Sequence, residues 1–185
     1  MGTPSDPLKS STQPQPHFHI TQATTDQDLA AIVDLFTAYT AWLDEDLTFQ
    51  SYEAELAGLP GKYSPPTGAL LIAKDSTTGE ALGCIALRPL QLRDEYLDEQ
   101  RRGTRFCEIK RLYTYPVARG RGVARSLIRE ALAAAGREGY QEVLLDTLSR
   151  MVAAIKLYKT EGFEETGPYY PSPLENVVYM AKRVA

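Results

Sequence analysis

The sequence contains no long hydrophobic run. None of its apolar stretches approaches the roughly 18 residues that a membrane-spanning helix needs, so no membrane partner is expected. It also lacks an excess of positive charge, because 20 Lys and Arg stand against 24 Asp and Glu, which gives a net charge of −4 and an isoelectric point near 5.3. General nucleic-acid binders are usually basic, so no nucleic-acid partner is expected either.

Cysteine and histidine are scarce, with two of each. Cys84 and Cys107 lie in apolar runs, where free cysteines usually pack as small hydrophobic side chains; one disulfide between them is the alternative. Neither a disulfide scaffold nor a metal cluster is expected, and a reducing, cytoplasmic location fits best. His17 and His19 flank Phe18 at strand spacing with no third ligand nearby, so a strand start is favoured over a zinc site, and no metal is expected.

The composition divides the chain into two parts. Residues 1–16 are rich in Pro, Ser, Thr and Gln and have almost nothing to bury, so we expect a disordered N-terminal tail. They lack the apolar stretch of a signal peptide. Residues 17–185 are expected to form a single domain, because a length of 185 residues with 43% hydrophobic residues suits one buried core.

The hydrophobic pattern changes between strand and helix periods along the chain. Thr24 or Thr25 can cap the first helix, and a turn around 75–79 joins two apolar segments into a hairpin. Strands are expected at 18–22, 70–74, 81–88, 106–115, 143–145, 163–166 and 177–180, and the later helices at 51–57, 122–135 and 152–159. The order β-α-α-β-β-β-α-β-α-β-β predicts an α/β (α+β) fold.

A glycine-rich turn at 116–124 separates a predicted strand from a predicted helix. Glycine lets backbone N–H groups approach a ligand closely, and a helix N-terminus adds unpaired N–H donors and the positive end of a dipole. Such a turn suits a pyrophosphate. A P-loop is excluded because Gly-Lys-Ser/Thr is missing, and a dinucleotide fingerprint from Gly120 and Gly122 fails because Arg125 stands at the third glycine position.

What remains is the pattern R-x-x-G-x-G/A, formed by Arg119, Gly122 and Ala124. With this loop the sequence resembles the GCN5-related N-acetyltransferase (GNAT) superfamily, in which the loop cradles the pyrophosphate of acetyl-CoA. Two further segments carry the resemblance. L-x-T-x-P at 112–116 is similar to the superfamily's strand whose backbone pairs with pantetheine, and A-x-x-L-Y-x-x-x-G-F at 154–163 is similar to its later helix.

The resemblance covers residues 18–180 and includes the order of strands. It implies the GNAT acyl-CoA N-acyltransferase fold, with a central mixed, mostly antiparallel sheet flanked by helices, and acetyl-CoA as co-substrate. The cofactor-binding residues that it implies are Leu112, Tyr113, Thr114, Arg119, Gly120, Arg121, Gly122, Val123, Ala124 and Arg125. Nine Lys or Arg between 101 and 129 would attract phosphate charge. For Arg101, Arg102 and Arg105, a solvated charge run is an equally complete explanation.

Acetyl transfer to an amine needs a group that takes a proton from the nucleophile and a proton donor for the departing thiolate. Strand alternation places Glu108, Lys110, Leu112 and Thr114 on one face. The superfamily often has its general base four residues before the position of Leu112, so the resemblance implies Glu108 as general base, commonly acting through a water. The alternative is a structural salt bridge from Glu108 to Lys110 or Arg111.

Tyr158 matches the tyrosine that superfamily members use as general acid toward the leaving thiolate. A phenol with a reference pKa of about 10 can donate a proton near neutral pH. The alternative is a core aromatic with a satisfied hydroxyl. Many members have Asn three residues before the alanine of this helix, where this chain has Met151, so the helix's cofactor contacts are expected to differ, with a backbone group or Ser149 as a substitute.

The acceptor side is less defined by the sequence. Residues 26–55 contain eight acids and no Lys or Arg: Asp26, Asp28, Asp34, Asp44, Glu45, Asp46, Glu53 and Glu55. An acidic rim favours a cationic amine, and a solvated helical face is the alternative. The aromatic residues Tyr39, Trp42, Phe49, Tyr52, Tyr169 and Tyr170 can line a pocket or belong to the core, which we favour for Trp42 and Phe49. Arg88 can hold an acceptor carboxylate.

Taken together, these features predict an acetyl-CoA-dependent N-acetyltransferase that acts on a primary amine of a small molecule. A protein or peptide N-acetyltransferase is the first alternative. A non-catalytic acyl-CoA-binding module is the second, and the presence of both Glu108 and Tyr158 speaks against it. The sequence gives no indication of an oligomeric state.

Overall fold

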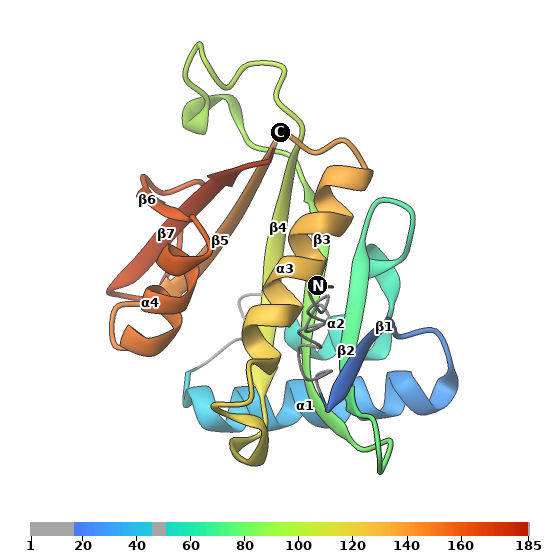
Figure 1. Cartoon of the computed structure of the whole chain (residues 1–185). Helices are drawn as coiled ribbons and strands as arrows, with labels where there is room; N and C mark the ends of the chain where they lie inside the picture. The colour runs from blue at the N-terminus through green and yellow to red at the C-terminus, as the bar shows by residue number, and fades with distance from the viewer. Residues whose placement is uncertain (1–16, 46–50, 185) are drawn as a thin grey trace, which may run out of the picture.

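The computed structural model describes residues 17–45 and 51–184 (Figure 1). The predicted tail at 1–16, Asp46 and Phe49 lie outside these ranges. The elements are β1 (Phe18–Gln22), α1 (Asp26–Leu43), α2 (Tyr52–Ala57), β2 (Ala69–Asp75), β3 (Ala81–Leu90), β4 (Phe106–Thr114), α3 (Val123–Arg137), β5 (Glu142–Leu148), α4 (Val152–Thr160), β6 (Glu164–Thr166) and β7 (Val177–Arg183). This order of helices and strands confirms the prediction.

All described strands belong to one seven-stranded sheet with the order β1-β2-β3-β4-β5-β7-β6. Neighbouring strands are antiparallel except for β4 and β5, which are parallel. The helix α3 connects these two parallel strands, as a crossover between parallel neighbours requires. The expectation of a mixed, mostly antiparallel sheet is therefore confirmed.

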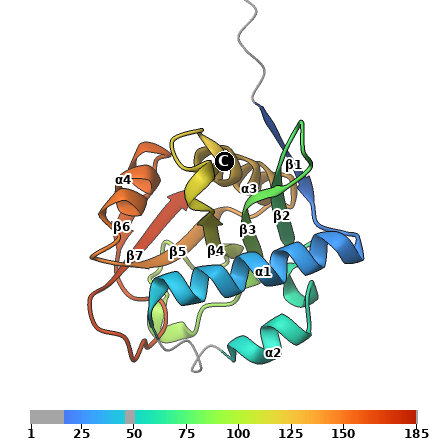
Figure 2. The ribbon, with the colours of Figure 1, turned by 90° about the horizontal axis from the view of Figure 1, so that it is seen from below.

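The helices cover both faces of the sheet. Figure 2 shows α1 and α2 on one face and α3 and α4 on the other. The layer under α3 and α4 is built around Leu127, Ile128 and Leu145, and the layer under α1 and α2 around Leu35 and Phe36. Each layer buries the apolar face that helical spacing predicted, and this burial fixes the two helix pairs on opposite sides of the strands.

Helix α1 begins and ends at defined caps. The Thr25 side chain accepts a hydrogen bond from the Asp28 N–H, and the Asp28 carboxylate accepts in return from the Thr25 N–H, which forms a capping box. Thr25 is therefore the cap, one of the two candidates. At the other end Asp44 adopts a left-handed conformation with φ of 53°. The Arg150 guanidinium donates to the Leu43 carbonyl over 2.6 Å, which ties this end of α1 to the segment between β5 and α4.

Three sequence expectations concern membranes, metals and thiols. Over residues 17–45 and 51–184, no helix has the length and apolar character of a membrane span. In the same ranges, no group of three or more His, Cys, Asp or Glu is placed to hold a metal ion. Cys84 and Cys107 are both buried and unbridged, and burial raises the pKa of each thiol, that of Cys107 to about 12. Both act as small buried side chains.

Candidate active site

The parallel strands β4 and β5 pair over only a short stretch. Phe106 faces Glu142, and the pairing ends where Glu108 faces Leu144. Beyond this point the two strands diverge (Figure 1), and a pocket of about 400 Å³ opens at the fork. The lining consists of Tyr39, Trp42, Leu43, Ile109, Lys110, Arg111, Leu112, Tyr113, Thr114, Arg119, Ala124, Asp146, Thr147, Leu148, Met151, Ala153, Ala154, Leu157, Tyr158 and Leu174.

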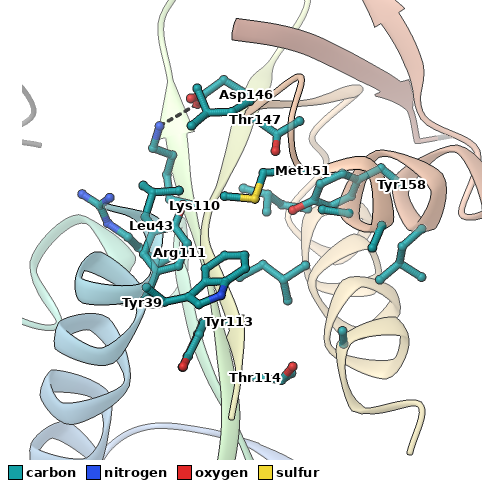
Figure 3. Close-up of a pocket in the computed structure, with 18 of the residues that line it drawn as sticks. Tyr39, Leu43, Lys110, Arg111, Tyr113, Thr114, Asp146, Thr147, Met151 and Tyr158 are labelled. Atoms are coloured by element: carbon teal, nitrogen blue, oxygen red, sulfur yellow. Dashed lines mark hydrogen bonds and ion pairs between the residues drawn. The ribbon is translucent and has the colours of Figure 1, made fainter. Parts of the chain in front are cut away.

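The pocket reaches both faces of the sheet. Tyr39 and Leu43 line it from α1, which covers one face, whereas Ala124 of α3 and Tyr158 of α4 line it from the other face (Figure 3). A molecule bound along α3 can therefore meet a second molecule that approaches from α1. Such a passage between two faces suits a reaction between two substrates.

A β-bulge in β4 shapes the floor of the pocket. Lys110 pairs with Ala86 and Tyr113 pairs with Cys84, so two residues of β4, Arg111 and Leu112, oppose one residue of β3. Arg111 has a φ of 58°, a left-handed conformation that non-glycine residues rarely adopt. The bulge interrupts the strand alternation at the fork.

This bulge corrects one sequence expectation. Strict alternation placed Leu112 and Thr114 on the face of Glu108 and Lys110. In the structure Leu112 packs against the core under α3, whereas Tyr113 packs under α1. The expectation is therefore wrong beyond the bulge, because the extra residue shifts the side-chain period by one. Leu112, Tyr113 and Thr114 all still line the pocket, as the resemblance implied.

Arg111, at the bulge, is held by a buried carboxylate. Its guanidinium donates to both oxygens of Glu55 over 3.0 and 2.9 Å and lies 5.2 Å from the Tyr52 ring centre. The Tyr63 hydroxyl donates to the same carboxylate over 2.9 Å. Burial opposes the charges, but the pair outweighs it, so the pKa of Glu55 is lowered and that of Arg111 is raised.

The glycine-rich turn leads into α3 at one end of the pocket. Gly120 and Gly122 have φ values of 76° and 81°, and Gly122 is the N-cap of α3. The first helical hydrogen bond runs from the Ser126 N–H to the Gly122 carbonyl, so the N–H groups of 123–125 precede the helical ladder. A Cβ at either glycine would meet nothing within 4 Å, so the space beside the turn at these two residues is open. Val123 is 1% exposed, so only its backbone can contribute here.

The arginines of this segment do not all face the pocket. Arg121 pairs with Asp75 over 2.8 Å, and Arg125 pairs with Glu161 over 3.1 Å. The hydrogen bond from Arg121 lowers the pKa of Asp75 to about 2. Neither arginine lines the pocket, whereas Arg119 does. Arg121 and Arg125 must therefore exchange these partners if their side chains are to bind phosphate.

Trp42 was expected in the core, and this expectation is wrong. Its side chain is 49% exposed and lines the pocket, and the Arg119 guanidinium carbon lies 5.5 Å above its ring centre. Trp42 is at the last turn of α1, where its ring packs against Tyr113 of β4 at 6.2 Å and its remaining surface is open to the pocket. An aromatic residue at helical spacing can thus be lining rather than core.

Glu108 lies behind the pocket wall. Its side chain is 1% exposed, and its carboxylate accepts hydrogen bonds from Arg88 Nε over 2.8 Å and from the Tyr169 hydroxyl over 2.7 Å. Lys110 Nζ lies 3.5 Å away. Of the two salt-bridge partners weighed for Glu108, Lys110 is present and Arg111 pairs with Glu55 instead, whereas the principal partner, Arg88, was not expected. Arg88 is therefore not free to hold an acceptor carboxylate, and Glu108 is not part of the lining.

An ion pair between Lys110 and Asp146 bridges the two strands at the fork. Nζ and Oδ1 are 2.7 Å apart, and the side chains are 9% and 16% exposed (Figure 3). Burial opposes both charges, but the pair prevails, so the pKa of Asp146 is lowered and that of Lys110 is raised. The sequence reasoning missed Asp146. The sequence feature that could have identified Asp146 is its position directly after the apolar strand core at 143–145.

Tyr158 lines the pocket from α4. It lies near the end of α4, where its carbonyl accepts from the Phe163 N–H over 3.0 Å and its ring packs against Phe163 at 5.7 Å. Figure 3 shows its hydroxyl pointing into the cavity. Burial raises the pKa of Tyr158, so the phenol keeps its proton at neutral pH. Met151, at the N-cap of α4, also lines the pocket.

The acids of 26–55 do not form a rim around the pocket. Asp28 pairs with Lys74, and Glu45 pairs with Arg150. In the described part of the chain, no acid of this stretch is among the lining residues. Asp28, Glu45 and Glu55 instead use their charges in a helix cap and in ion pairs. Of the other aromatic candidates, Tyr39 lines the pocket, whereas Tyr52, Tyr169 and Tyr170 do not.

Comparisons with known proteins agree with this architecture. The Acetyltransferase (GNAT) family profile matches residues 18–163. An uncharacterized N-acetyltransferase of Schizosaccharomyces pombe is 40% identical over 154 residues, which cover 83% of this chain and 87% of that protein. Among solved structures, the NatC complex bound to Gag peptide and CoA matches with 22% identity and a TM-score of 0.66, covering 91% of this chain and 99% of that chain. Spermidine N-acetyltransferase from Vibrio cholerae, in complex with CoA and spermine, matches with 18% identity and a TM-score of 0.61, covering 92% and 97%.

The forked sheet with its two-faced pocket defines the class of acyl-CoA N-acyltransferases. The chain belongs to the acetyltransferase (GNAT) family and is an acyltransferase. Acetyl-CoA, the acetyl donor of this family, is compatible with the observed site. The N–H groups of 123–125 precede the helical ladder and can donate to phosphates, and apolar residues of β4 and α4 continue from there toward Tyr158.

Proposed function

We propose that this protein is an acetyl-CoA-dependent N-acetyltransferase that acetylates a primary amine of a small molecule, with Tyr158 as general acid and with Glu108 as a buried carboxylate that supports proton removal indirectly. The observation that carries the proposal is the position of the Tyr158 hydroxyl. It points into the fork pocket, between the turn that suits a pyrophosphate and the α1 side, from which an acceptor can enter (Figure 3).

The coenzyme end of the pocket is proposed to run along the turn at 119–125 and the bulged strand at 112–114. The open space at the Cβ positions of Gly120 and Gly122 supports the phosphate position, because a ligand can approach the backbone there without meeting a side chain. Leu112 and Leu157 then provide an apolar channel for the pantetheine arm. Arg119 is the arginine whose side chain can reach a phosphate from the lining.

Proton removal is proposed to depend on the buried carboxylate of Glu108, which does not face the pocket. Lys110 lies between Glu108 and the pocket. Its Nζ is 3.5 Å from the Glu108 carboxylate, and its side chain lines the pocket. Glu108 therefore affects the amine indirectly, through the charge of Lys110. Tyr158 needs no such relay, because its hydroxyl is in the lining and its pKa is raised by burial.

The choice of a small molecule is supported by the small volume of the pocket. α1, β5 and the segment containing Leu174 surround the acceptor side within a total volume of about 400 Å³. The two CoA-bound relatives, one with a peptide and one with spermine, indicate that this fold serves both classes of acceptor. Two buried free thiols support a cytoplasmic location, which we also propose.

The test is CoA thiol release by the full chain with acetyl-CoA and two acceptor sets. One set contains small primary amines, and the other contains peptides with free N-termini or lysines. Turnover with small amines at a kcat/KM at least tenfold above that of any peptide supports the proposal. Turnover confined to peptides would contradict the small-molecule assignment, and tight acetyl-CoA binding with no thiol release for either set would indicate a non-catalytic acyl-CoA-binding module.

A further inference from the structure

A row of alternating charges runs through the sheet and ends at the pocket. Arg88 pairs with Glu108 over 2.6 Å, Glu108 lies 3.5 Å from Lys110, and Lys110 pairs with Asp146 over 2.7 Å. Asp146 is the last member and the only carboxylate in the described lining. The pocket beyond it is therefore the place where another positive group would continue the row.

The position of Asp146 belongs to the acceptor side of the pocket. The turn and α3, which suit the coenzyme phosphates, lie on one face of the sheet (Figure 2). Asp146 lies on the last part of β5, past the final pairing with β4, and its side chain meets Lys110 on the far side of the cavity from α3 (Figure 3). The Tyr158 hydroxyl points into the space between them.

The same side of the pocket carries an apolar wall. Leu43 of α1 and Leu148 of β5 form a buried cluster, which Tyr39, Met151 and Leu174 complete. All five residues line the pocket. This wall offers no carboxylate for a second ammonium group. Lys110 and Arg111, which also line the acceptor side, would repel a further positive charge.

We propose that Asp146 binds the acceptor amine and takes its proton, and that the acceptor is a primary monoamine with an apolar carbon skeleton that packs against Leu43 and Leu148. This inference rests on the proposed acetyltransferase function and names its substrate class. It also assigns the carboxylate that contacts the amine, with Glu108 behind Lys110 as a positioning residue for the ion row.

With these assignments, every bond and every proton of the acetyl transfer is accounted for. The acceptor binds as an ammonium ion and first loses one proton to Asp146, which releases this proton to solvent. The neutral amine nitrogen then forms a bond to the acetyl carbonyl carbon, and the bond from that carbon to sulfur breaks. The proton leaving nitrogen passes to the Asp146 carboxylate, and the phenol of Tyr158 gives its proton to sulfur. Solvent returns the proton from Asp146 to Tyr158, so both residues are restored and no other reactant is needed.

The first experiment compares acceptors on the unmodified full chain. Phenethylamine and hexylamine represent apolar monoamines, and spermidine represents a polyamine. We expect a kcat/KM for the monoamines at least tenfold above that for spermidine, because only one lining carboxylate can accept a cation. A kcat/KM for spermidine equal to or above that of the monoamines would overturn the substrate class.

The second experiment compares variants with hexylamine as acceptor. Asp146→Asn should lower kcat/KM about 10³-fold, through both a higher KM and a lower kcat, while the Kd of acetyl-CoA stays within threefold. Asp146→Glu should recover part of the loss. The control is Glu130→Gln, an exposed ion-pair partner of Arg137, which should keep wild-type kinetics. An Asp146→Asn enzyme within fivefold of wild type would refute the role of Asp146.

A third variant keeps the inference testable if Asp146→Asn fails to fold. Leu174→Asp adds a carboxylate to the half-buried part of the apolar wall. It should raise the ratio of kcat/KM for 1,5-diaminopentane over hexylamine at least tenfold, and an unchanged ratio in a folded variant would contradict the acceptor position. The proposed function fails separately, if the folded wild type binds acetyl-CoA but acetylates no free amine.

Discussion

Replacing Tyr158 with phenylalanine separates its chemical role from its packing role. The side chain is 7% exposed, and its ring packs edge-on against Phe163 at 5.7 Å. Phenylalanine keeps this ring and removes only the hydroxyl that points into the fork pocket. In the described ranges, no protein group hydrogen-bonds that hydroxyl, so Tyr158→Phe removes no intramolecular hydrogen bond.

The expected magnitudes follow from this environment. Loss of a proton donor that acts only in the transition state should lower kcat and kcat/KM together by about 10²-fold, which corresponds to about 2.7 kcal/mol of barrier. The free energy of unfolding should stay nearly unchanged, because no hydrogen bond is lost. The Kd of acetyl-CoA should also change little, since the phosphate contacts are at the other end of the pocket.

The assay is steady-state thiol release together with a thermal melt, and Tyr140→Phe is the matched control. The Tyr140 hydroxyl donates to the Thr67 carbonyl over 2.7 Å, outside the pocket. Its removal should cost about 1 kcal/mol and lower the Tm by about 2–4 °C, without changing kcat. Tyr158→Phe should show the reverse, a lower kcat with an unchanged Tm.

The pH dependence adds a further readout for Tyr158. Because burial raises its pKa above the ordinary value of about 10, the phenol stays protonated across the neutral and mildly alkaline range. Deprotonation of this residue should therefore produce no fall in kcat below about pH 10. Near-normal turnover by Tyr158→Phe, or a kcat that falls near pH 8 in the wild type but not in the variant, would refute the acid role.

Three other substitutions test the remaining parts of the site. Gly122→Glu should abolish acetyl-CoA binding in calorimetry. The control is Gly103→Glu, at another open glycine with positive φ, which should introduce similar backbone strain but leave the Kd of acetyl-CoA unchanged. Equal affinities of the two variants for acetyl-CoA would disprove the phosphate position. Glu108→Gln should lower kcat roughly 10²-fold, and a variant with the kcat of wild type would reduce Glu108 to an ion-pair partner. Glu55→Gln should destabilise the fold by about 3–5 kcal/mol in urea unfolding, because the buried Arg111 loses its carboxylate. The lowered pKa of Glu55 means that this stabilisation is present above about pH 4 and is lost as the pH falls through the folded-state pKa, so a variant as stable as wild type at pH 7 would contradict the assignment.

The periodic elements were predictable because local patterns determine them. Thr25 and Asp28 form the cap that a helix start requires, and the glycines at 120 and 122 have the positive φ values that a turn before a helix suggested. The resemblance identified Tyr158, and the structure places this residue in the pocket. In each case neighbouring residues contain the signal, so the order of elements and the turn could be inferred from the sequence.

The interior of the site was less predictable because long-range pairing decides it. The bulge at Arg111 depends on a carboxylate 56 positions away in the chain, and no local pattern marks it. Asp146 faces the pocket only because β4 and β5 separate after Glu108. Trp42 had the helical spacing of a core residue, but only Tyr113 of the sheet packs against its ring and the rest of the side chain borders the pocket. These features arise from packing between elements, which periodicity does not encode.

A crystal structure of the complex with acetyl-CoA tests the central claim most directly. The account predicts pyrophosphate density against the backbone N–H groups of 119–125, the pantetheine arm along 112–114, and the thioester sulfur within hydrogen-bonding distance of the Tyr158 hydroxyl. Density for the coenzyme outside the fork, or a thioester remote from Tyr158 with phosphates away from the turn, would contradict the account.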